Sequence, residues 1–287
     1  MEPIQRRALT PGYLAGVVWV AIVRLRRHNG QAIAGDLAFT ILLALFPFLI
    51  FASSLAGYFG EQVDTEIVVE QVLRFAPPVV AESLVPAIEH AVGARSGSAA
   101  LLGMVLGLVF AAMGVEAFRG ALNTAFECHG LRPWWWRIIV NLLFVVVGSI
   151  GFLAATLVAV VWPVAAEFIP ALAPLEGLVL SGPLRYVEVA LLLAIMATAF
   201  YRWLPDSPPS LRHALPGAIV SAVLWLVAAA TYAAYARTLA RYALVYGSLA
   251  GVIVTLVFFY VSALTFVFGA ELNAANAEAR GEHMRDA

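Results

Sequence analysis

The sequence predicts an all-α integral membrane protein with six transmembrane helices. Hydrophobic residues make up 62% of the 287 residues and charged residues only 12%, with a mean hydropathy of +0.90. A soluble globular domain carries about 25% charged residues. Six apolar segments are close to the roughly 20 residues that a helix needs to cross a bilayer. These predicted spans are residues 34–58, 98–126, 138–161, 186–204, 214–235 and 246–272.

Residues 1–33 are predicted to form a cytoplasmic segment that contains an interfacial helix. The apolar run at 13–23 is too short to cross a bilayer and is followed by Arg24, Arg26 and Arg27. It also lacks the small-residue cleavage site of a signal peptide. An apolar face beside a group of arginines favours a helix that lies in the headgroup plane.

The segment 60–97, between the first two predicted spans, is expected to hold two short amphipathic helices outside the membrane. Apolar residues recur at helical spacing in each half of the segment, and Pro77-Pro78 separates the two halves. These helices either rest on the outer leaflet or cap a cavity between the spans.

The distribution of arginine orients the chain. All 17 basic residues are Arg, and with the N-terminus inside, 12 of them fall in cytoplasmic segments and 5 on the outer side. The positive-inside rule then places both termini, with the tail 273–287, in the cytoplasm of a bacterial inner membrane. No repeat or linker divides the chain, so residues 34–272 are expected to form one membrane domain.

The composition argues against several classes of function. A net charge of −1 argues against nucleic-acid binding, which needs a strongly basic face. The one cysteine, Cys128, excludes an intramolecular disulfide and a Cys-based metal site. The five histidines are scattered, without the clustered ligands that metal-dependent cleavage requires. We therefore expect no catalytic residue, no metal and no cofactor, and we do not expect nuclease activity.

The second predicted span carries a polar stripe. Glu116, Arg119 and Asn123 recur at steps of three and four and share one helix face. Polar groups inside a span are costly, so the stripe is expected to face the protein interior and a substrate pathway. The alternative is that Glu116 and Arg119 only neutralise each other as a structural ion pair. The opposite face is expected to pack closely on a neighbouring helix through Gly103, Gly107 and Gly114.

Two residues of the first predicted span are further pathway candidates. Asp36 stands near its start, where it serves either as an N-terminal cap or as part of the pathway. Pro47 lies in its middle and is expected to kink the helix, because proline lacks the backbone N–H. Transporters use such broken helices to place backbone groups around a substrate.

The last predicted span combines a small-residue seam with one acidic residue. We expect close helix packing at the seam, formed by Gly247, Gly251 and Gly269. Glu271, near the cytoplasmic end, is a pathway candidate that could pair with Arg119 or Arg202.

Arg237 and Arg241 lie one helical turn apart between the last two spans, on the predicted outer side. Their guanidinium groups suit phosphate or carboxylate, so they either hold a lipid headgroup or an anionic substrate, or are neutralised by outer carboxylates. The loop 206–210 is interpreted as a stiff cytoplasmic turn, and we assign no chemistry to it.

Six short motifs occur in order along nearly the whole chain, at residues 34–39, 42–47, 121–124, 201–205, 246–252 and 268–273. Together they resemble the YihY / virulence factor BrkB family, historically mislabelled ribonuclease BN. The resemblance implies a polytopic bacterial inner-membrane protein with six spans and both ends inside. Members have been described as candidate transporters of lipids or envelope precursors.

These observations predict a transporter or flippase of an amphipathic, anionic, lipid-like or envelope-precursor substrate. The alternative is a membrane scaffold for envelope assembly that binds partner helices through its glycine seams. The expected partners are membrane lipids and such a substrate, without nucleic acid. The sequence leaves the oligomeric state open, a homo-oligomer included.

Overall fold

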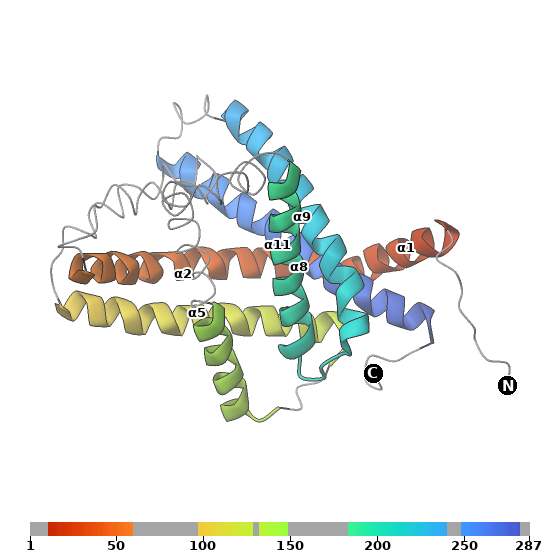
Figure 1. Ribbon diagram of the computed structural model, residues 1–287, viewed down its shortest axis with the longest axis horizontal. Helices are drawn as coiled ribbons and strands as arrows, with labels where there is room; N and C mark the ends of the chain where they lie inside the picture. Colours follow the sequence, from red (N-terminus) through yellow and green to blue (C-terminus); the bar gives the residue numbers. More distant parts are fainter. Residues whose placement is uncertain (1–10, 60–96, 129–131, 149–182, 240–247, 282–287) are drawn as a thin grey trace, which may run out of the picture.

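The computed structural model describes residues 11–59, 97–128, 132–148, 183–239 and 248–281 (Figure 1). Within these ranges the regular secondary structure is α-helical. The helices are α1 (Pro11–Arg27), α2 (Gly30–Phe59), α5 (Gly97–Ala125), the Trp134–Gly148 helix, α8 (Pro183–Trp203), α9 (Leu211–Leu239) and α11 (Ser248–Ala279). The predicted amphipathic helices of 60–97 lie outside the described residues.

Three of the described helices are long and apolar enough to cross a membrane, judged by length and composition. These candidate spans are Val105–Ala125, Leu211–Tyr235 and Val252–Ala279. They match the second, fifth and sixth predicted spans. The other three predicted spans correspond to shorter described apolar helices, Gly30–Ala44, Trp134–Gly148 and Val189–Trp203. The all-helical membrane fold is therefore confirmed for the described residues, and the count of six spans stays a prediction.

A tight turn separates α1 from α2. Asn29 adopts a left-handed backbone conformation, with φ of 53°, and Gly30 packs so closely on Leu25 that a side chain there would overlap it. Because α2 begins at Gly30, Asp36 lies in its second turn and is exposed. The suggestion that Asp36 caps the helix is therefore wrong.

Helices α2 and α5 run side by side in opposite directions (Figure 1). Near the start of α2, Ala34 and Leu37 are buried against Ala121 of α5 and Ala263 and Val267 of α11. Figure 1 shows that α8, α9 and α11 cross this pair toward one end, where α1 also lies. Most of the helix contacts therefore gather at one end of the molecule.

Helices α9 and α11 form a second antiparallel pair with a close backbone contact. A Cβ atom added to Gly269 would lie 2.6 Å from the carbonyl oxygen of Gly217. Asn273 reinforces the contact, because its Oδ1 accepts from the N–H of Gly217 at 2.6 Å and its Nδ2 donates to the carbonyl of Ala214 at 2.9 Å. The side-chain amide thus ties α11 to the first turns of α9, where Pro216 interrupts the regular hydrogen bonding.

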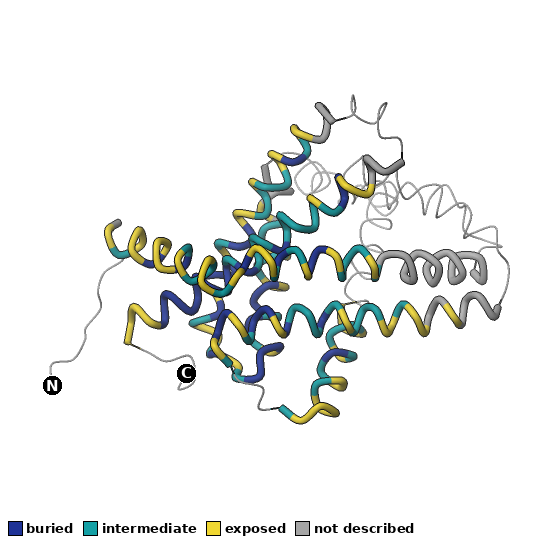
Figure 2. The backbone as a smooth tube through the Cα atoms, turned by 180° about the vertical axis from the view of Figure 1, so that it is seen from behind, coloured by how far each residue is buried: buried dark blue, intermediate teal, exposed yellow. Residues whose placement is uncertain are grey.

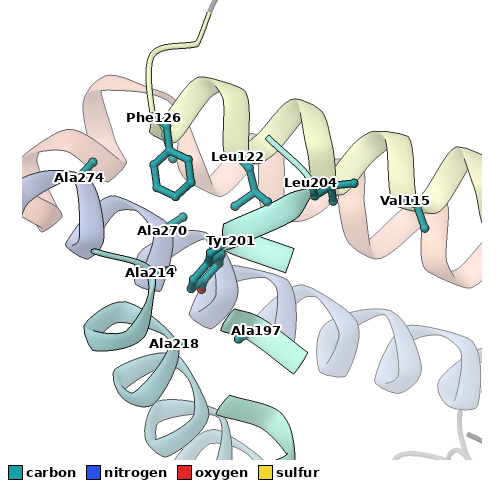
Figure 3. Packing of buried hydrophobic residues seen from close by; sticks show 11 residues of the cluster. Val115, Leu122, Phe126, Ala197, Tyr201, Leu204, Ala214, Ala218, Ala270 and Ala274 are labelled. Atoms are coloured by element: carbon teal, nitrogen blue, oxygen red, sulfur yellow. The ribbon is translucent and has the colours of Figure 1, made fainter. Parts of the chain in front are cut away.

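Tyr201 of α8 stands at the centre of the largest buried cluster (Figure 3). Its ring packs beside Phe126, and its hydroxyl donates to the carbonyl of Phe266 at 2.6 Å. The buried residues concentrate where these helices cross (Figure 2), whereas large apolar side chains along α5, α8 and α9 are exposed. An apolar outer surface around a small buried centre is what lipid contact requires.

We predict that Gly269→Ala destabilises the protein and that Gly114→Ala does not. The new methyl group at residue 269 would lie 2.6 Å from the Gly217 carbonyl oxygen, so α9 and α11 must separate, at about 1–3 kcal/mol. At residue 114 an added Cβ meets no atom within 4 Å, and alanine favours the helix. Thermal unfolding in detergent measures both variants. Equal melting temperatures for the two would contradict the close contact.

Candidate functional site

The polar stripe of α5 forms the centre of a buried ionic network, here called the Arg119 cluster. Arg119 is only 5% exposed. Its Nη1 donates to both carboxylate oxygens of Asp206, at 2.8 and 2.9 Å, and its Nε donates to Glu116 Oε2 at 2.8 Å. Arg119 Nη2 also binds the other Glu116 oxygen. The arginine therefore lies between two carboxylates, one on its own helix and one on a distant loop.

Asp206 belongs to the loop between α8 and α9, and its side chain is fully buried. Asn123 holds this loop through two hydrogen bonds. Its Nδ2 donates to Asp206 Oδ2 at 3.0 Å, and its Oδ1 accepts from the Asp206 backbone N–H at 2.9 Å. The interpretation of the loop as a turn without chemistry is therefore wrong: it supplies the second counter-ion of Arg119.

The Trp134–Gly148 helix supplies the third side of the cluster. Arg137 donates to Glu116 Oε1, and Asn141 Nδ2 donates to Glu116 Oε2 at 2.8 Å. With the bonds from Arg119, Glu116 accepts from three different side chains. Two arginines face two carboxylates across the cluster, so its formal charge is balanced. Charge balance is what a buried ionic group in a membrane protein requires.

The simple ion-pair interpretation of Glu116 and Arg119 holds only in part. The two side chains do pair within α5, but each also binds residues of other elements: Asp206, Arg137 and Asn141. Sequence reasoning missed these three partners. Asn141 is an isolated amide inside an apolar run, which is a signal of a buried polar contact that could have been used.

A groove of about 560 Å³ lies between α5 and the Trp134–Gly148 helix. One end is polar, where Glu116, Arg137 and Asn141 meet it. The rest is lined by aliphatic and aromatic side chains, namely Leu108, Val109, Ala112, Met113, Trp134, Ile138 and Leu142. The Arg119 cluster thus adjoins an apolar channel on the side of α5.

A second ionic group, here called the Glu271 cluster, joins α1 to α11. Glu271 has a side chain only 1% exposed and accepts from Arg24 Nε at 3.2 Å and contacts His28 Nδ1 at 2.7 Å. Glu271 therefore pairs with Arg24 and His28, and not with Arg119 or Arg202 as the sequence suggested. The reason is that α1 folds back onto α11, burying Val17 and Ala21 against it.

The Glu271 cluster also reaches α5. Arg24 Nη2 donates to the carbonyl of Ala125, at the end of α5, at 2.9 Å and pairs with Glu127 at 3.1 Å. An open pocket of about 470 Å³ adjoins it, lined by Arg27, His28, Asn123, Thr124, Glu127 and Cys128. Since Asn123 also holds Asp206, this residue connects the two clusters.

The structure therefore brings three predicted pathway residues together, Glu116, Arg119 and Asn123, and places Glu271 in a neighbouring cluster. Asp36 lies on α2 with no described partner. Pro47 lies within the continuous backbone of α2, and Arg237 in the last turn of α9. The structure does not describe the side chains of Pro47 and Arg237, and Arg241 lies outside the described residues.

The glycines that were expected to pack closely on neighbouring helices differ in their surroundings. Gly269 makes the close contact with α9 described above, whereas the space beside Gly114 is open and Gly107 is half-buried. Close packing at Gly114 is therefore not what the described helices show. Gly247 and the surroundings of Gly103 and Gly251 lie outside the described residues.

Comparison with known proteins identifies relatives along most of the chain. The family model described as virulence factor BrkB matches residues 21–287. The ribonuclease-like protein YfkH of Bacillus subtilis is 33% identical over 88% of this chain and 91% of its own length.

Two relatives named UPF0761 membrane protein are longer than this chain. That of Alkalilimnicola ehrlichii is 27% identical over 95% of this chain, and that of Rhodospirillum centenum is 29% identical over 94%. The matches cover 63% and 60% of these two relatives. No solved structure matches the chain.

We predict that Glu271→Gln loosens α1. The substitution keeps the shape of the side chain but removes the charge that holds Arg24 and His28, and breaking a buried ion pair costs about 3–5 kcal/mol. Trypsin cleavage after the exposed residues Arg26 and Arg27 should become several-fold faster. Mass spectrometry of the released N-terminal peptide measures the rate.

Glu278→Gln is the matched control, because Glu278 contacts the same arginine at 3.3 Å but is 65% exposed. Exposed pairs contribute about 0–1 kcal/mol. If both variants were cleaved at the wild-type rate, the Glu271 cluster would not be what holds α1.

Proposed function

The chain belongs to the virulence factor BrkB family of membrane proteins, and from this premise we propose that it is an inner-membrane transporter, or flippase, of an amphipathic lipid-like molecule. The observation that carries the proposal is the Arg119 cluster at the polar end of the groove beside α5. An ionic group next to an apolar channel matches a molecule that has a polar headgroup and a hydrocarbon chain.

The position of the cluster along α5 supports this assignment. Arg119 lies six residues before the end of the helix, about 9 Å at 1.5 Å per residue. This end of α5 faces the cytoplasm if both termini do, as the distribution of arginine indicates. The exposed residues Trp134, Trp135 and Trp136 begin the neighbouring helix, and aromatic residues of this kind anchor membrane proteins at the interface. The proposed site therefore opens at headgroup depth of the inner leaflet.

The packing of the cluster gives the proposed transport step. Glu116 is accessible from the groove, but Arg119 is buried beneath it between Glu116 and Asp206. A polar headgroup can reach the deeper arginine only when Arg137 and Asn141 release Glu116. In the proposed mechanism these two side chains form the gate, and the Trp134–Gly148 helix moves relative to α5.

A non-transporting scaffold for envelope assembly is the second candidate. The same closed packing of Arg119 favours it, because a permanently sealed ionic core holds helices together without passing a substrate. In a scaffold, substitutions at the gate would alter stability and leave lipid movement across the bilayer unchanged.

We do not extend the ribonuclease-like name of YfkH to this chain. The two described histidines make contacts within the fold: His28 binds Glu271 at 2.7 Å, and His213 Nδ1 lies 2.6 Å from the hydroxyl of Ser210. We propose that the chain is not an enzyme. Metal-dependent RNA cleavage by the purified protein, abolished by a histidine substitution, would overturn this part of the proposal.

We predict that the purified protein, reconstituted in liposomes, moves fluorescent phospholipid between leaflets and that Glu116→Gln speeds this movement about tenfold, because a neutral residue holds the Arg137 gate less tightly. The variant weakens charge-assisted hydrogen bonds from both Arg119 and Arg137, each worth about 1.5–3 kcal/mol. Quenching of the outer-leaflet fluorophore by dithionite measures the rate.

The control is Arg280→Gln, because Arg280 is exposed and lies outside both clusters. It should move lipid at the wild-type rate. Liposomes with wild-type protein that equilibrate lipid no faster than protein-free liposomes would favour the scaffold.

A further inference from the structure

We propose that the groove beside α5 binds a zwitterionic phospholipid whose headgroup carries a primary amine, and that Asn141 Oδ1 accepts a hydrogen bond from that amine. The inference rests on the proposed function for the lipid class and adds the chemistry of the headgroup. Four features of the site support it: a hydrogen-bond acceptor without a partner, an arginine with unused N–H donors, the charge balance and the shape of the groove.

The acceptor is Asn141 Oδ1. It is a buried atom without a hydrogen-bond partner, and no other buried side-chain nitrogen or oxygen among the described residues lacks one. The orientation of the amide is fixed by its neighbour, because a carboxylate only accepts, so Nδ2 must face Glu116 and Oδ1 must point the other way. Asn141 is 5% exposed and lines the groove. A buried acceptor that makes no hydrogen bond is unfavourable, so this oxygen favours a ligand with a hydrogen-bond donor.

The spare donors belong to Arg137. Its side chain is 38% exposed, and one of its Nη groups binds Glu116. A guanidinium has five N–H donors, and in the described part of the chain the remaining ones have no protein partner. Arg137 also lines the groove, four residues and one helical turn before Asn141. A phosphate at Arg137 would therefore place the rest of a headgroup within reach of Asn141.

The charge balance selects among headgroups. Glu116 and Asp206 already neutralise Arg119 and Arg137, so a ligand of net negative charge would leave the site unbalanced. A phosphate with an ammonium group adds no net charge. The phosphate would face Arg137, and the ammonium would face Asn141 Oδ1, on the side of the amide that points away from Glu116. The charge balance therefore favours a zwitterionic headgroup over the anionic substrate expected from the sequence.

The apolar part of the groove suits one acyl chain. Leu108 lies eight residues before Glu116 on α5, about 12 Å along the helix. Leu108, Ala112 and Met113 line this stretch from the polar end toward the middle of the bilayer. The headgroup would then lie at the tryptophan level and the chain would follow α5 inward.

The test is lipid binding to the full-length protein, measured by native mass spectrometry with added phosphatidylethanolamine, phosphatidylcholine or phosphatidylglycerol. Phosphatidylcholine keeps the positive charge but has no N–H donor. We expect it to bind about tenfold more weakly, the loss of one hydrogen bond from a charged donor. Asn141→Leu should abolish the difference between these two lipids. Val147→Leu, on the exposed face of the same helix, should preserve it.

A second variant keeps the test valid if Asn141→Leu does not fold. Met113→Trp fills the apolar part of the groove and keeps every residue of the Arg119 cluster, and it should weaken binding of all three lipids. Equal binding of phosphatidylethanolamine and phosphatidylcholine would overturn the inference. Tighter binding of phosphatidylglycerol than of phosphatidylethanolamine would also overturn it. If Asn141→Leu still preferred phosphatidylethanolamine over phosphatidylcholine as the wild type does, the inference would be wrong and water would be left as the partner of Oδ1. Selective binding without lipid movement would contradict only the transport proposal.

Discussion

A charged side chain in a membrane-embedded helix must be neutralised by the protein, and this constraint at Arg119 determines much of the structure. Ionisable side chains within membrane spans are costly unless they are paired. Here Arg119 is buried between Glu116 and Asp206, and Asn123 fixes the backbone that carries Asp206. The α8–α9 loop is therefore held against α5, which positions the end of α8 and the start of α9.

The helices converge because two such ionic clusters lie at the same end of the molecule. The Glu271 cluster holds α1 and the end of α5 to α11, and the backbone contact of Gly217 with Gly269 closes α9 onto α11. Away from this end, α2 and α5 extend beyond the crossing helices (Figure 1). A polar end beside an apolar groove suits the proposed handling of lipid, because a headgroup would meet polar side chains while its acyl chain stays in hydrocarbon.

The sequence was sufficient for the helices and for the face of α5 that turns inward, since both depend on local spacing. It was insufficient for partners that only the tertiary fold brings together. Asp206 is 87 residues from Arg119, and Glu271 is 247 residues from Arg24, so no periodicity relates them. The start of α2 differs from the sequence prediction, because its first two residues are Gly30 and Gln31 and the left-handed turn at Asn29 has no apolar signal. For this reason the helix cap, one of the two roles that the sequence suggests for Asp36, does not fit the structure.

The central claim is that Arg119 and Asp206 stabilise the protein as a pair. A double-mutant cycle with Arg119→Gln and Asp206→Asn tests it most directly, by denaturant unfolding in detergent micelles. Arg119→Gln leaves the buried Asp206 without its counter-ion and should cost about 3–5 kcal/mol. Asp206→Asn should cost less, because Arg119 keeps Glu116 as a counter-ion. The double variant should be less destabilised than the sum of the two by at least about 1.5 kcal/mol. Effects that add to within about 0.5 kcal/mol would contradict the account.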